Sequence, residues 1–206
     1  MNVLGISCSP KKNGCTVTLV NEALKGAKQE GAKTELYSLS GKDIKPCDGC
    51  RTCAKTGVCR IKDDMHDLYK KMTEANAIIY GTPTYFYSMA SQTKIIIDRS
   101  RALHDVPTKN LPNRLANKVG GVIAVGGSLG LVDILKDLYF YMITHYMLPG
   151  DYAAVYALEK KELEKRVEGK KAVFTLGRQM ARLASIKFEY PSDLMTPSIA
   201  YGTWKH

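Results

Sequence analysis

The sequence predicts a single α/β domain: a doubly wound, three-layer sandwich built on a five-stranded parallel sheet. Short apolar runs without helical period alternate along the chain with segments whose apolar residues recur every three or four positions. Strands and helices that alternate in this way form a parallel sheet with helices on both faces. The 206 residues suffice for one such domain with a full hydrophobic core and are short for two.

The start of the chain predicts a β-α-β unit. The run NVLGISC, residues 2–8, is apolar and leads into the turn-forming SPKKNG, as expected of a buried strand. From Thr16 to Gly31 apolar residues recur at helical spacing, and the glycine is typical of a helix end. These apolar positions are Val17, Val20, Leu24 and Ala27. Residues 34–39 predict the second strand.

Three more strands and four more helices follow. Residues 63–74 carry acidic residues first and lysines later, as the dipole of a helix prefers. Further helices are expected at 92–103, at 132–147 and at 163–183, the last with a break near Gly169. Strands are expected at 77–80, 119–125 and 152–158. The tail, residues 190–206, has no clear period, and we expect it to pack on a neighbour.

Composition limits the function classes. Hydrophobic residues make up 45% and charged residues 24%, the balance of a globular protein. The net charge of +10 attracts nucleic acid, anionic cofactors or an acidic protein alike, and does not choose among them. No apolar run approaches the roughly 18 residues of a membrane span, and the N-terminus lacks signal-peptide features. We therefore expect a cytoplasmic protein with reduced thiols and no membrane partner.

Three loops after predicted strands have the chemistry of a cofactor site, because the carboxyl ends of parallel strands form a ligand crevice. The first loop offers hydroxyls, cations and the free N–H groups of a helix start, which suit a phosphate. Its candidates are Ser9, Lys11, Asn13, Gly14 and Thr16. The loop is neither GxGxxG nor GxxxxGK[ST], and a polar turn that only caps a helix is the alternative.

The second loop, GTPTYFYSM, supplies aromatic faces on a proline-stiffened backbone, as a flat conjugated ring requires. Its candidates are Pro83, Thr84, Tyr85 and Phe86. Three adjacent aromatics in a loop cannot all face the core, which argues against simple packing. In the third loop, GGSLG, Gly126 and Gly127 let the main chain approach the ring from the other side. Together the three loops describe an FMN site.

Four cysteines fall within one short segment with the spacing CxxCxxCx5C: Cys47, Cys50, Cys53 and Cys59. Three thiolates at two-residue gaps, closed by a fourth, follow the ligand pattern of a [4Fe–4S] cluster. Structural zinc more often uses two CxxC pairs held apart by a longer spacer. The sequence favours the cluster, with zinc and a disulfide or free thiols as alternatives.

GISCSPKKNGCT and GTPTYFYSMASQTKIIIDR resemble the two signature loops of the flavodoxin-like NAD(P)H-dependent FMN reductase superfamily. A compact cysteine motif inserted after the second strand, in residues 45–62, resembles one family within it, the iron–sulfur flavoproteins of archaea and anaerobes. The resemblance spans most of the chain. It implies a flavodoxin-like fold, FMN held by the loop residues named above, and a [4Fe–4S] cluster on the four cysteines.

The resemblance also implies partners. Members of the family form homodimers or homotetramers in which the cluster of one subunit lies close to the flavin of its neighbour. They accept electrons from ferredoxin and are connected with reduction of oxygen and peroxide. This chain departs from the pattern at Cys15, where relatives carry a small polar residue, and in GGSLG, which has few polar side chains.

On this reading electrons pass from ferredoxin, or a similar acidic donor, to the cluster, to FMN, and on to oxygen, peroxide or a quinone. No acid–base residue is required, so no catalytic side chain is assigned, and the four histidines take solvated or core roles. One rival is an NAD(P)H-dependent FMN or quinone reductase with a structural four-cysteine zinc site. A zinc-stabilised nucleic-acid binder ranks last, since the basic and aromatic residues do not interleave.

Overall fold

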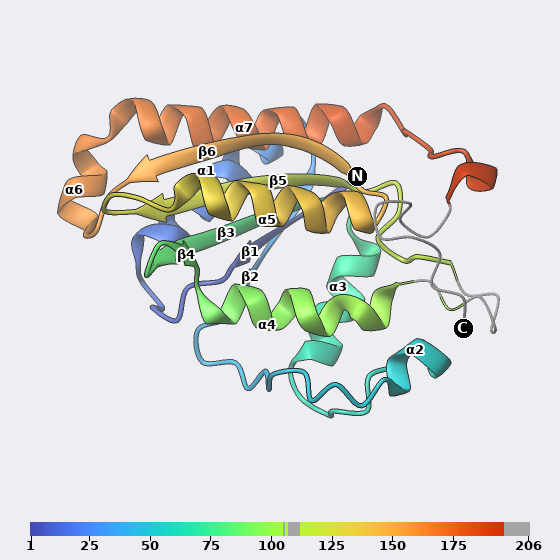
Figure 1. Ribbon diagram of the computed structural model, residues 1–206. Helices are drawn as coiled ribbons and strands as arrows, with labels where there is room; N and C mark the ends of the chain where they lie inside the picture. The colour runs from blue at the N-terminus through green and yellow to red at the C-terminus, as the bar shows by residue number, and fades with distance from the viewer. Residues whose placement is uncertain (105, 107–111, 196–206) are drawn as a thin grey trace.

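The computed structural model describes residues 1–104, 106 and 112–195. A central sheet runs through the molecule with its parallel strands in the order β2-β1-β3-β5-β6 (Figure 1). The strands are β1 (Asn2–Ser7), β2 (Lys33–Ser38), β3 (Ala77–Tyr85), β5 (Val119–Gly126) and β6 (Leu148–Tyr156). The order reverses beside β1 and β3, which creates the crevice that doubly wound sheets use for ligands.

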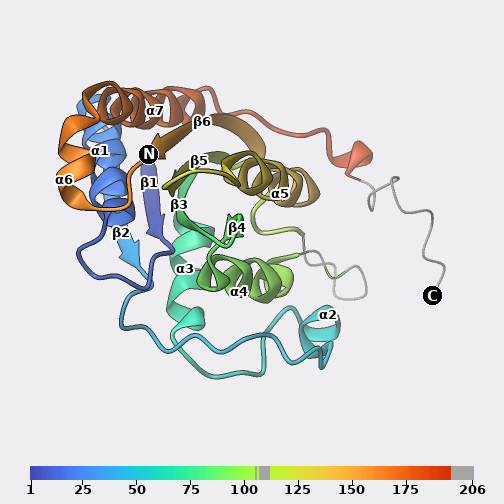
Figure 2. The same cartoon turned by 60° about the vertical axis from the view of Figure 1, so that its left-hand side comes forward.

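Helices cover both faces of the sheet (Figure 2). One face carries α1 (Cys15–Gln29), α6 (Lys160–Lys165) and α7 (Val167–Ser185). The other carries α3 (Met65–Glu74), α4 (Ser91–Arg99), with the 3-10 turn η1 (Ser100–Leu103) after it, and α5 (Leu131–Thr144). A last 3-10 turn, η3, spans Ser192–Leu194. Two helix layers around one sheet give the three-layer sandwich that the sequence predicts.

Alternate side chains of the buried strands feed two separate cores. Ile6, Ile78 and Tyr80 point to the face of α3, α4 and α5. Val3, three positions before Ile6, and Ile79, between Ile78 and Tyr80, point to the face of α1 and α7. Because both faces are covered, these strands are continuous apolar runs without polar alternation.

Helices α1 and α7 approach so closely that only glycine fits between them. A Cβ atom at Gly177 of α7 would lie 1.7 Å from the carbonyl oxygen of Ala23. A Cβ atom at Gly26 of α1 would lie 2.0 Å from the carbonyl oxygen of Phe174. The contact fixes α7 over α1, and Glu30 adds ion pairs to Arg178 and Arg182 at one end.

The sheet has six strands, so the predicted count of five was wrong. The five parallel strands are present, and the additional strand is β4 (Ser88–Met89), which pairs antiparallel with the end of β3. The predicted third strand ended at Tyr80, but the chain continues to pair with β5 as far as Pro83. The Gly-Thr-Pro sequence that indicates a turn is accommodated inside a strand.

Two other boundaries differ from expectation. The break in the last helix falls at Arg166, between α6 and α7, where the Arg166 side chain donates to the carbonyl oxygen of Tyr156 at 2.8 Å. Gly169 lies inside α7, where its missing side chain allows close contact with Val155. Strand β6 begins at Leu148, earlier than the predicted start at residue 152.

The structure describes only part of the tail, residues 190–206, which was expected to pack on a neighbour. Residues 196–206, including His206, lie outside the described residues. The Tyr190 ring contacts Tyr146 and Phe188 edge-on, and its backbone N–H donates to Asn117 Oδ1 at 2.9 Å. This part of the tail therefore packs on its own domain. In the described part of the chain, no helix combines the length and apolar character needed to cross a bilayer.

The cysteine segment, residues 45–62, connects β2 to α3. It runs below α4 and contains the short helix α2 (Thr52–Thr56) (Figure 1). Both views place α2 near the end of α4 that is remote from β4, where it contacts η1 (Figures 1 and 2). The segment and the β3–β4 hairpin therefore lie toward opposite ends of α4.

Candidate functional site

The three loops that the sequence singles out converge at the carboxyl edge of the sheet. The methyl group of Thr16, at the start of α1, lies 3.3 Å from the position of a Cβ atom at Gly81 of β3. A Cβ atom at Gly130, after the third loop, would lie 2.4 Å from the carbonyl oxygen of Tyr87 in the hairpin. Glycine at 81 and 130 thus lets the three loops meet around one crevice.

The first loop has the features of a phosphate site. The Ser9 and Thr16 side chains are buried, each 2% exposed, at the amino end of α1. The Ser9 hydroxyl accepts a hydrogen bond from the backbone N–H of Lys11 at 3.1 Å, which shapes the turn. Gly14 precedes the helix, and no side chain caps it. The first-turn N–H groups have no acceptor within the helix and suit an anion.

Lys11 and Asn13 are exposed on the same loop. No acidic residue lies in the first turn of α1, so nothing there opposes a bound phosphate. The loop is held against the end of β2 by Ser40, whose hydroxyl donates to the carbonyl oxygen of Pro10 at 2.9 Å.

The second loop is a tight β-hairpin in which β3 turns back into β4. Thr84 pairs with Met89 and Tyr85 with Ser88, which leaves Phe86 and Tyr87 as the two turn residues. Both have positive φ, 49° and 67°, the geometry of a type I′ turn. Asn and Gly prefer these positions and bulky aromatics rarely adopt them. A functional role for the two side chains would explain this strain.

The hairpin aromatics are exposed, as the sequence predicts. Tyr85 is 42%, Phe86 97% and Tyr87 60% exposed. Pro83 is buried at the end of the paired part of β3. The hairpin therefore presents its aromatic faces outward from a fixed base.

The site fits FMN on two structural observations. The hydroxyl oxygen of Thr84 is buried and has no hydrogen-bond partner among the described residues, so it is available to a polar edge of a ring. Gly126 lies against Thr84, and Gly127 lies against the side chain of Leu158. A side chain at Gly126 would meet Thr84 at the base of the hairpin, and one at Gly127 would meet Leu158.

The four clustered cysteines lie on the accessible side of their segment. Cys47 and Cys50 are exposed, and Cys53 and Cys59 are half-buried against the core of α3, α4 and α5. Gly49, Arg51 and Gly57 adopt positive φ, which turns the chain sharply between the cysteines. Among the residues that the structure describes, no group of three or more Cys, His, Asp or Glu side chains is arranged to hold a metal ion.

The donor set nevertheless fits an iron–sulfur centre. Burial raises the pKa of Cys53, and the other three thiols raise it further because like charges repel, while Arg101 opposes the shift. The charges of the other three thiols thus act on Cys53. Hydrogen bonds from Thr52 lower the pKa of Cys50, favouring the thiolate that metals bind. Four thiolates per cluster is the usual ligand set of a [4Fe–4S] centre.

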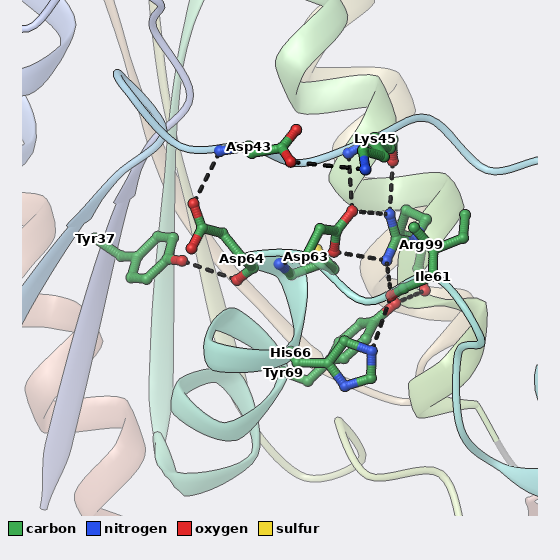
Figure 3. Close-up of polar contacts among 10 residues, drawn as sticks. Tyr37, Asp43, Lys45, Ile61, Asp63, Asp64, His66, Tyr69 and Arg99 are labelled. Atoms are coloured by element: carbon green, nitrogen blue, oxygen red, sulfur yellow. Dashed lines mark hydrogen bonds and ion pairs between the residues drawn. The ribbon is translucent and has the colours of Figure 1, made fainter.

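Contacts of three aspartates, Asp43, Asp63 and Asp64, connect the residues that precede the cysteine segment with those that follow it (Figure 3). The Asp43 N–H donates to Asp64 Oδ2 at 2.8 Å, and the Asp64 N–H donates to the Asp43 carbonyl oxygen at 3.0 Å. Tyr37 of β2 donates its hydroxyl to the carbonyl oxygen of Asp64 at 3.0 Å. Beside these lies a fully buried ion pair between Asp63 and Arg99.

A second arginine holds the segment near its last cysteine. Arg114 Nη2 donates to the carbonyl oxygen of Gly57 at 2.6 Å and also to that of Ala102 in η1. Asp48 and Arg60 form an ion pair across the segment. The chain around the thiols is thus anchored to the domain at a few defined points.

The other two cysteines, Cys8 and Cys15, are buried, and His66 and His145 have contacts with other residues. Burial raises the pKa of Cys8 to about 12, although a hydrogen bond with Thr93 lowers it, so this thiol is inert core. Cys15 is 8% exposed. His145 is buried between Ser100 and Asn113, and His66 contacts the carbonyl oxygen of Ile61.

An apolar groove of about 640 Å³ lies elsewhere, between α4 and α5. Its lining includes Ile97, Tyr139, Phe140 and Ile143. Its lining takes in none of the predicted site residues, which lie at the carboxyl edge and on the cysteine segment.

The sequence reasoning missed Arg99 and Asp63 as site residues. Arg99 closes the signature stretch, where a cation at a helix end is expected from the dipole alone. Asp63 resembles an ordinary acid at a helix start. The available signal was their position: Asp63 follows the cysteine segment directly, and Arg99 ends the helix that follows the ring loop.

Comparisons with known proteins identify relatives of this chain. The NADPH-dependent FMN reductase family matches residues 1–158. An iron–sulfur flavoprotein of Methanocaldococcus jannaschii is 41% identical over 150 residues, which cover 72% of this chain and 75% of that protein. An iron–sulfur flavoprotein of Methanosarcina thermophila is 35% identical over 150 residues, 72% of this chain and 76% of that protein.

Solved structures share the fold. RosB with bound 8-demethyl-8-formylriboflavin-5′-phosphate superposes with a TM-score of 0.72 at 14% identity, covering 100% of this chain and 96% of RosB. A flavone reductase gives a TM-score of 0.70 at 24% identity over 90% of this chain and 63% of that enzyme, so this chain spans less than two thirds of it. The chain belongs to the iron–sulfur flavoprotein family within the flavodoxin-like FMN reductases, and is a flavin-dependent oxidoreductase.

Proposed function

We propose that this oxidoreductase is a two-cofactor electron carrier, with FMN at the carboxyl edge of the sheet and a [4Fe–4S] cluster on the cysteine segment. The observation that carries the proposal is the presence of four accessible or half-buried cysteines on one short segment together with loops that fit FMN, in a chain related to iron–sulfur flavoproteins. When bound, a cluster of this kind exchanges single electrons, and FMN stores two and releases them to an acceptor.

The residues of the chain bind and orient these groups. Ser9, Lys11, Asn13, Gly14 and Thr16 hold the phosphate through hydroxyls, a cation and the first N–H groups of α1. Pro83, Thr84, Tyr85 and Phe86 orient the ring, and Gly126 and Gly127 leave it room. Cys47, Cys50, Cys53 and Cys59 ligate the cluster. No side chain is needed to move a proton.

The donor is ferredoxin or a similar acidic protein, and the acceptor is oxygen, peroxide or a quinone. The net charge of +10 supports an acidic donor, because opposite charges steer encounter. Reduction by such a donor should slow as ionic strength rises. A rate that is insensitive to salt would exclude steering.

The protein acts as a homodimer or homotetramer. Within one chain the hairpin and α2 lie toward opposite ends of α4, which separates the two cofactor regions (Figure 1). If the cluster region of one subunit lies beside the flavin region of its neighbour in the assembly, electrons pass between subunits. They then need not cross the separation within one chain. Sedimentation of the purified protein tests the assembly, and a monomer contradicts it.

The first test is quantification of FMN, iron, sulfide and zinc in anaerobically purified protein, with an absorption spectrum before and after dithionite. About four iron and four sulfide per chain beside FMN support the proposal. Cys59→Ser should abolish the cluster and keep FMN. Lys55→Ala, an exposed change in the same segment that keeps all four cysteines, is the matched control and should keep both.

A second candidate is an NAD(P)H-dependent FMN or quinone reductase whose four cysteines hold zinc. The match to the NADPH-dependent FMN reductase family favours it. Zinc without sulfide, together with rapid flavin reduction by NADPH in Cys59→Ser, would establish this function in place of the first.

A further inference from the structure

The buried arginine of α4 joins both ends of the cysteine segment (Figure 3). Arg99 Nη1 donates to the carbonyl oxygen of Lys45 at 2.6 Å and to Asp63 Oδ2 at 2.7 Å. Arg99 Nη2 donates to Asp63 Oδ1 at 3.0 Å and to the carbonyl oxygen of Ile61 at 3.3 Å. Lys45 precedes the first cysteine by two residues, and Ile61 follows the last by two.

Asp63 completes the closure. Its carboxylate accepts the backbone N–H of Lys45 at 2.9 Å and that of Met65 at 3.1 Å, in addition to the guanidinium fork. Burial acts to raise the pKa of Asp63, but the hydrogen bonds from Arg99, Lys45 and Met65 together lower it. The pair therefore remains ionised, and its geometry is bidentate.

Stability alone does not account for this pair. Both side chains are completely buried, and a buried ion pair is often no more stabilising than apolar residues of similar volume. What apolar residues cannot supply is a fork that holds two carbonyl groups and a carboxylate in one plane. The structure thus has directional hydrogen bonds from Arg99 at a place where apolar packing would have sufficed for folding.

Between the two fixed ends the segment has few other anchors. Cys47, Asp48, Gly49 and Cys50 are exposed, and the N-terminal half is held mainly at Lys45. Without the closure the thiols would sample many separations, and binding a centre would require ordering the loop at that moment. With it, the two ends of the segment, at Lys45 and Ile61, are held by one guanidinium on folding.

We propose that Arg99, acting through Asp63, is a positioning residue that joins the two ends of the cysteine segment into a closed loop, a cradle that the metal centre completes when it binds. The inference rests on the proposed function for the identity of that centre. The closure itself is a property of the protein chain, so it can be tested before any metal is bound.

Two variants distinguish a positioning role of Arg99 from an effect of its charge and from a general effect on folding. Arg99→Lys keeps the positive charge but has one ammonium group, which cannot engage Lys45, Ile61 and both oxygens of Asp63. Arg99→Met combined with Asp63→Asn removes both charges, so that no unpaired ion is left buried. The matched control is Arg178→Met combined with Glu30→Gln, which removes an ion pair between α7 and α1, away from the segment.

The first readout is hydrogen exchange of residues 45–61 in the FMN-bound protein before iron loading. We expect roughly tenfold or faster exchange of these amides in both Arg99 variants, with unchanged FMN per chain and unchanged exchange in the control. The second readout is iron and sulfide per FMN after reconstitution, with the electron paramagnetic resonance spectrum of the reduced protein. We expect several-fold lower content and a broadened spectrum.

Wild-type exchange in both Arg99 variants overturns the proposal. Wild-type exchange, iron content and spectrum in Arg99→Lys also overturn it, since charge alone would then suffice. If the unaltered protein takes up no iron and sulfide, the proposed function fails, yet the exchange data still decide the closure. Faster exchange confined to 45–61 would then support a cradle for another metal, read out by zinc content in the same variants.

Discussion

Thr84 and Gly126 face each other on neighbouring strands, β3 and β5, at the carboxyl edge of the sheet. A Cβ atom at position 126 would lie 2.8 Å from the hydroxyl oxygen of Thr84 and 2.9 Å from its Cβ atom. The Thr84 hydroxyl is itself buried without a partner among the described residues. The absence of a side chain at Gly126 therefore leaves the Thr84 hydroxyl in the position that we propose for contact with the flavin ring.

Gly126→Ala should weaken FMN binding. The added methyl group must displace Thr84, and with it the base of the hairpin, because both neighbours are close-packed. We expect at least about tenfold weaker binding, the equivalent of about 1.4 kcal/mol, in a flavin fluorescence titration of the stripped protein. Ser128→Ala, an exposed change in the same loop, is the control. Equal affinities for all three proteins would contradict this assignment of the loop.

Replacing the two turn aromatics should stabilise the fold and impair the site. Phe86→Asn with Tyr87→Gly supplies the residues that a type I′ turn prefers, and relieves positive φ at bulky side chains. We expect stability of the FMN-free protein to rise by about 1 kcal/mol in urea unfolding, while FMN binds more weakly. A variant that is less stable and binds FMN normally would show that the aromatics serve the fold.

His145 should make stability fall in acid. Burial lowers its pKa to about 3, and the nearby His104 and Arg101 lower it as well. Between about pH 6.5 and pH 3 the unfolded chain binds a proton here and the folded chain does not, so stability decreases as the pH falls through this window. The slope approaches about 1.4 kcal/mol per pH unit.

The measurement is the urea midpoint of the wild type and of His145→Gln at pH 7.5 and pH 5.5. The wild type should lose more stability than the variant between the two values, because glutamine does not titrate. An identical loss in both proteins would mean that another group controls acid unfolding.

Gly177→Ala should destabilise the protein. In an ordinary helix the change gains about 1 kcal/mol of helix propensity, but here the methyl group meets the carbonyl oxygen of Ala23. Overpacking of this kind costs about 1–3 kcal/mol or more, and each kcal/mol lowers Tm by about 2–4 °C in a chain of this size. Thr175→Ala, exposed on the same helix, should leave Tm equal or higher. A higher Tm in Gly177→Ala would mean that α7 can move away from α1 freely.

Much of the fold follows from local sequence pattern. The buried strands are continuous apolar runs, and residues 2–8 and 119–125 agree with β1 and β5 to within a residue. The end of β3 could not be predicted in this way, because Thr82 and Pro83 indicate a turn unless the neighbouring β5 is present to pair with them. The sixth strand depends on the same hairpin.

The candidate site shows the same contrast between features formed by adjacent residues and features formed by residues distant in sequence. The loops Ser9–Thr16 and Pro83–Phe86 could be proposed from the sequence because the candidate residues of each loop are adjacent in the chain. The closure of the cysteine segment was not, because Arg99 and Asp63 lie far apart in sequence and meet only after α4 packs beside α3. The spacing of the cysteines indicates candidate ligands, but only the folded chain shows which residues hold the two ends of their segment.

Helix α4 starts two residues after the hairpin and ends at Arg99. Its nine residues span about 13 Å, and each residue added or removed would turn everything beyond it by about 100°. A single insertion would thus turn the guanidinium away from Asp63, and from the carbonyl groups of Lys45 and Ile61, without changing any residue of the cysteine segment. The length of α4 therefore sets how far the Arg99–Asp63 pair lies from the hairpin, and its helical turn sets the direction in which the Arg99 side chain leaves the helix.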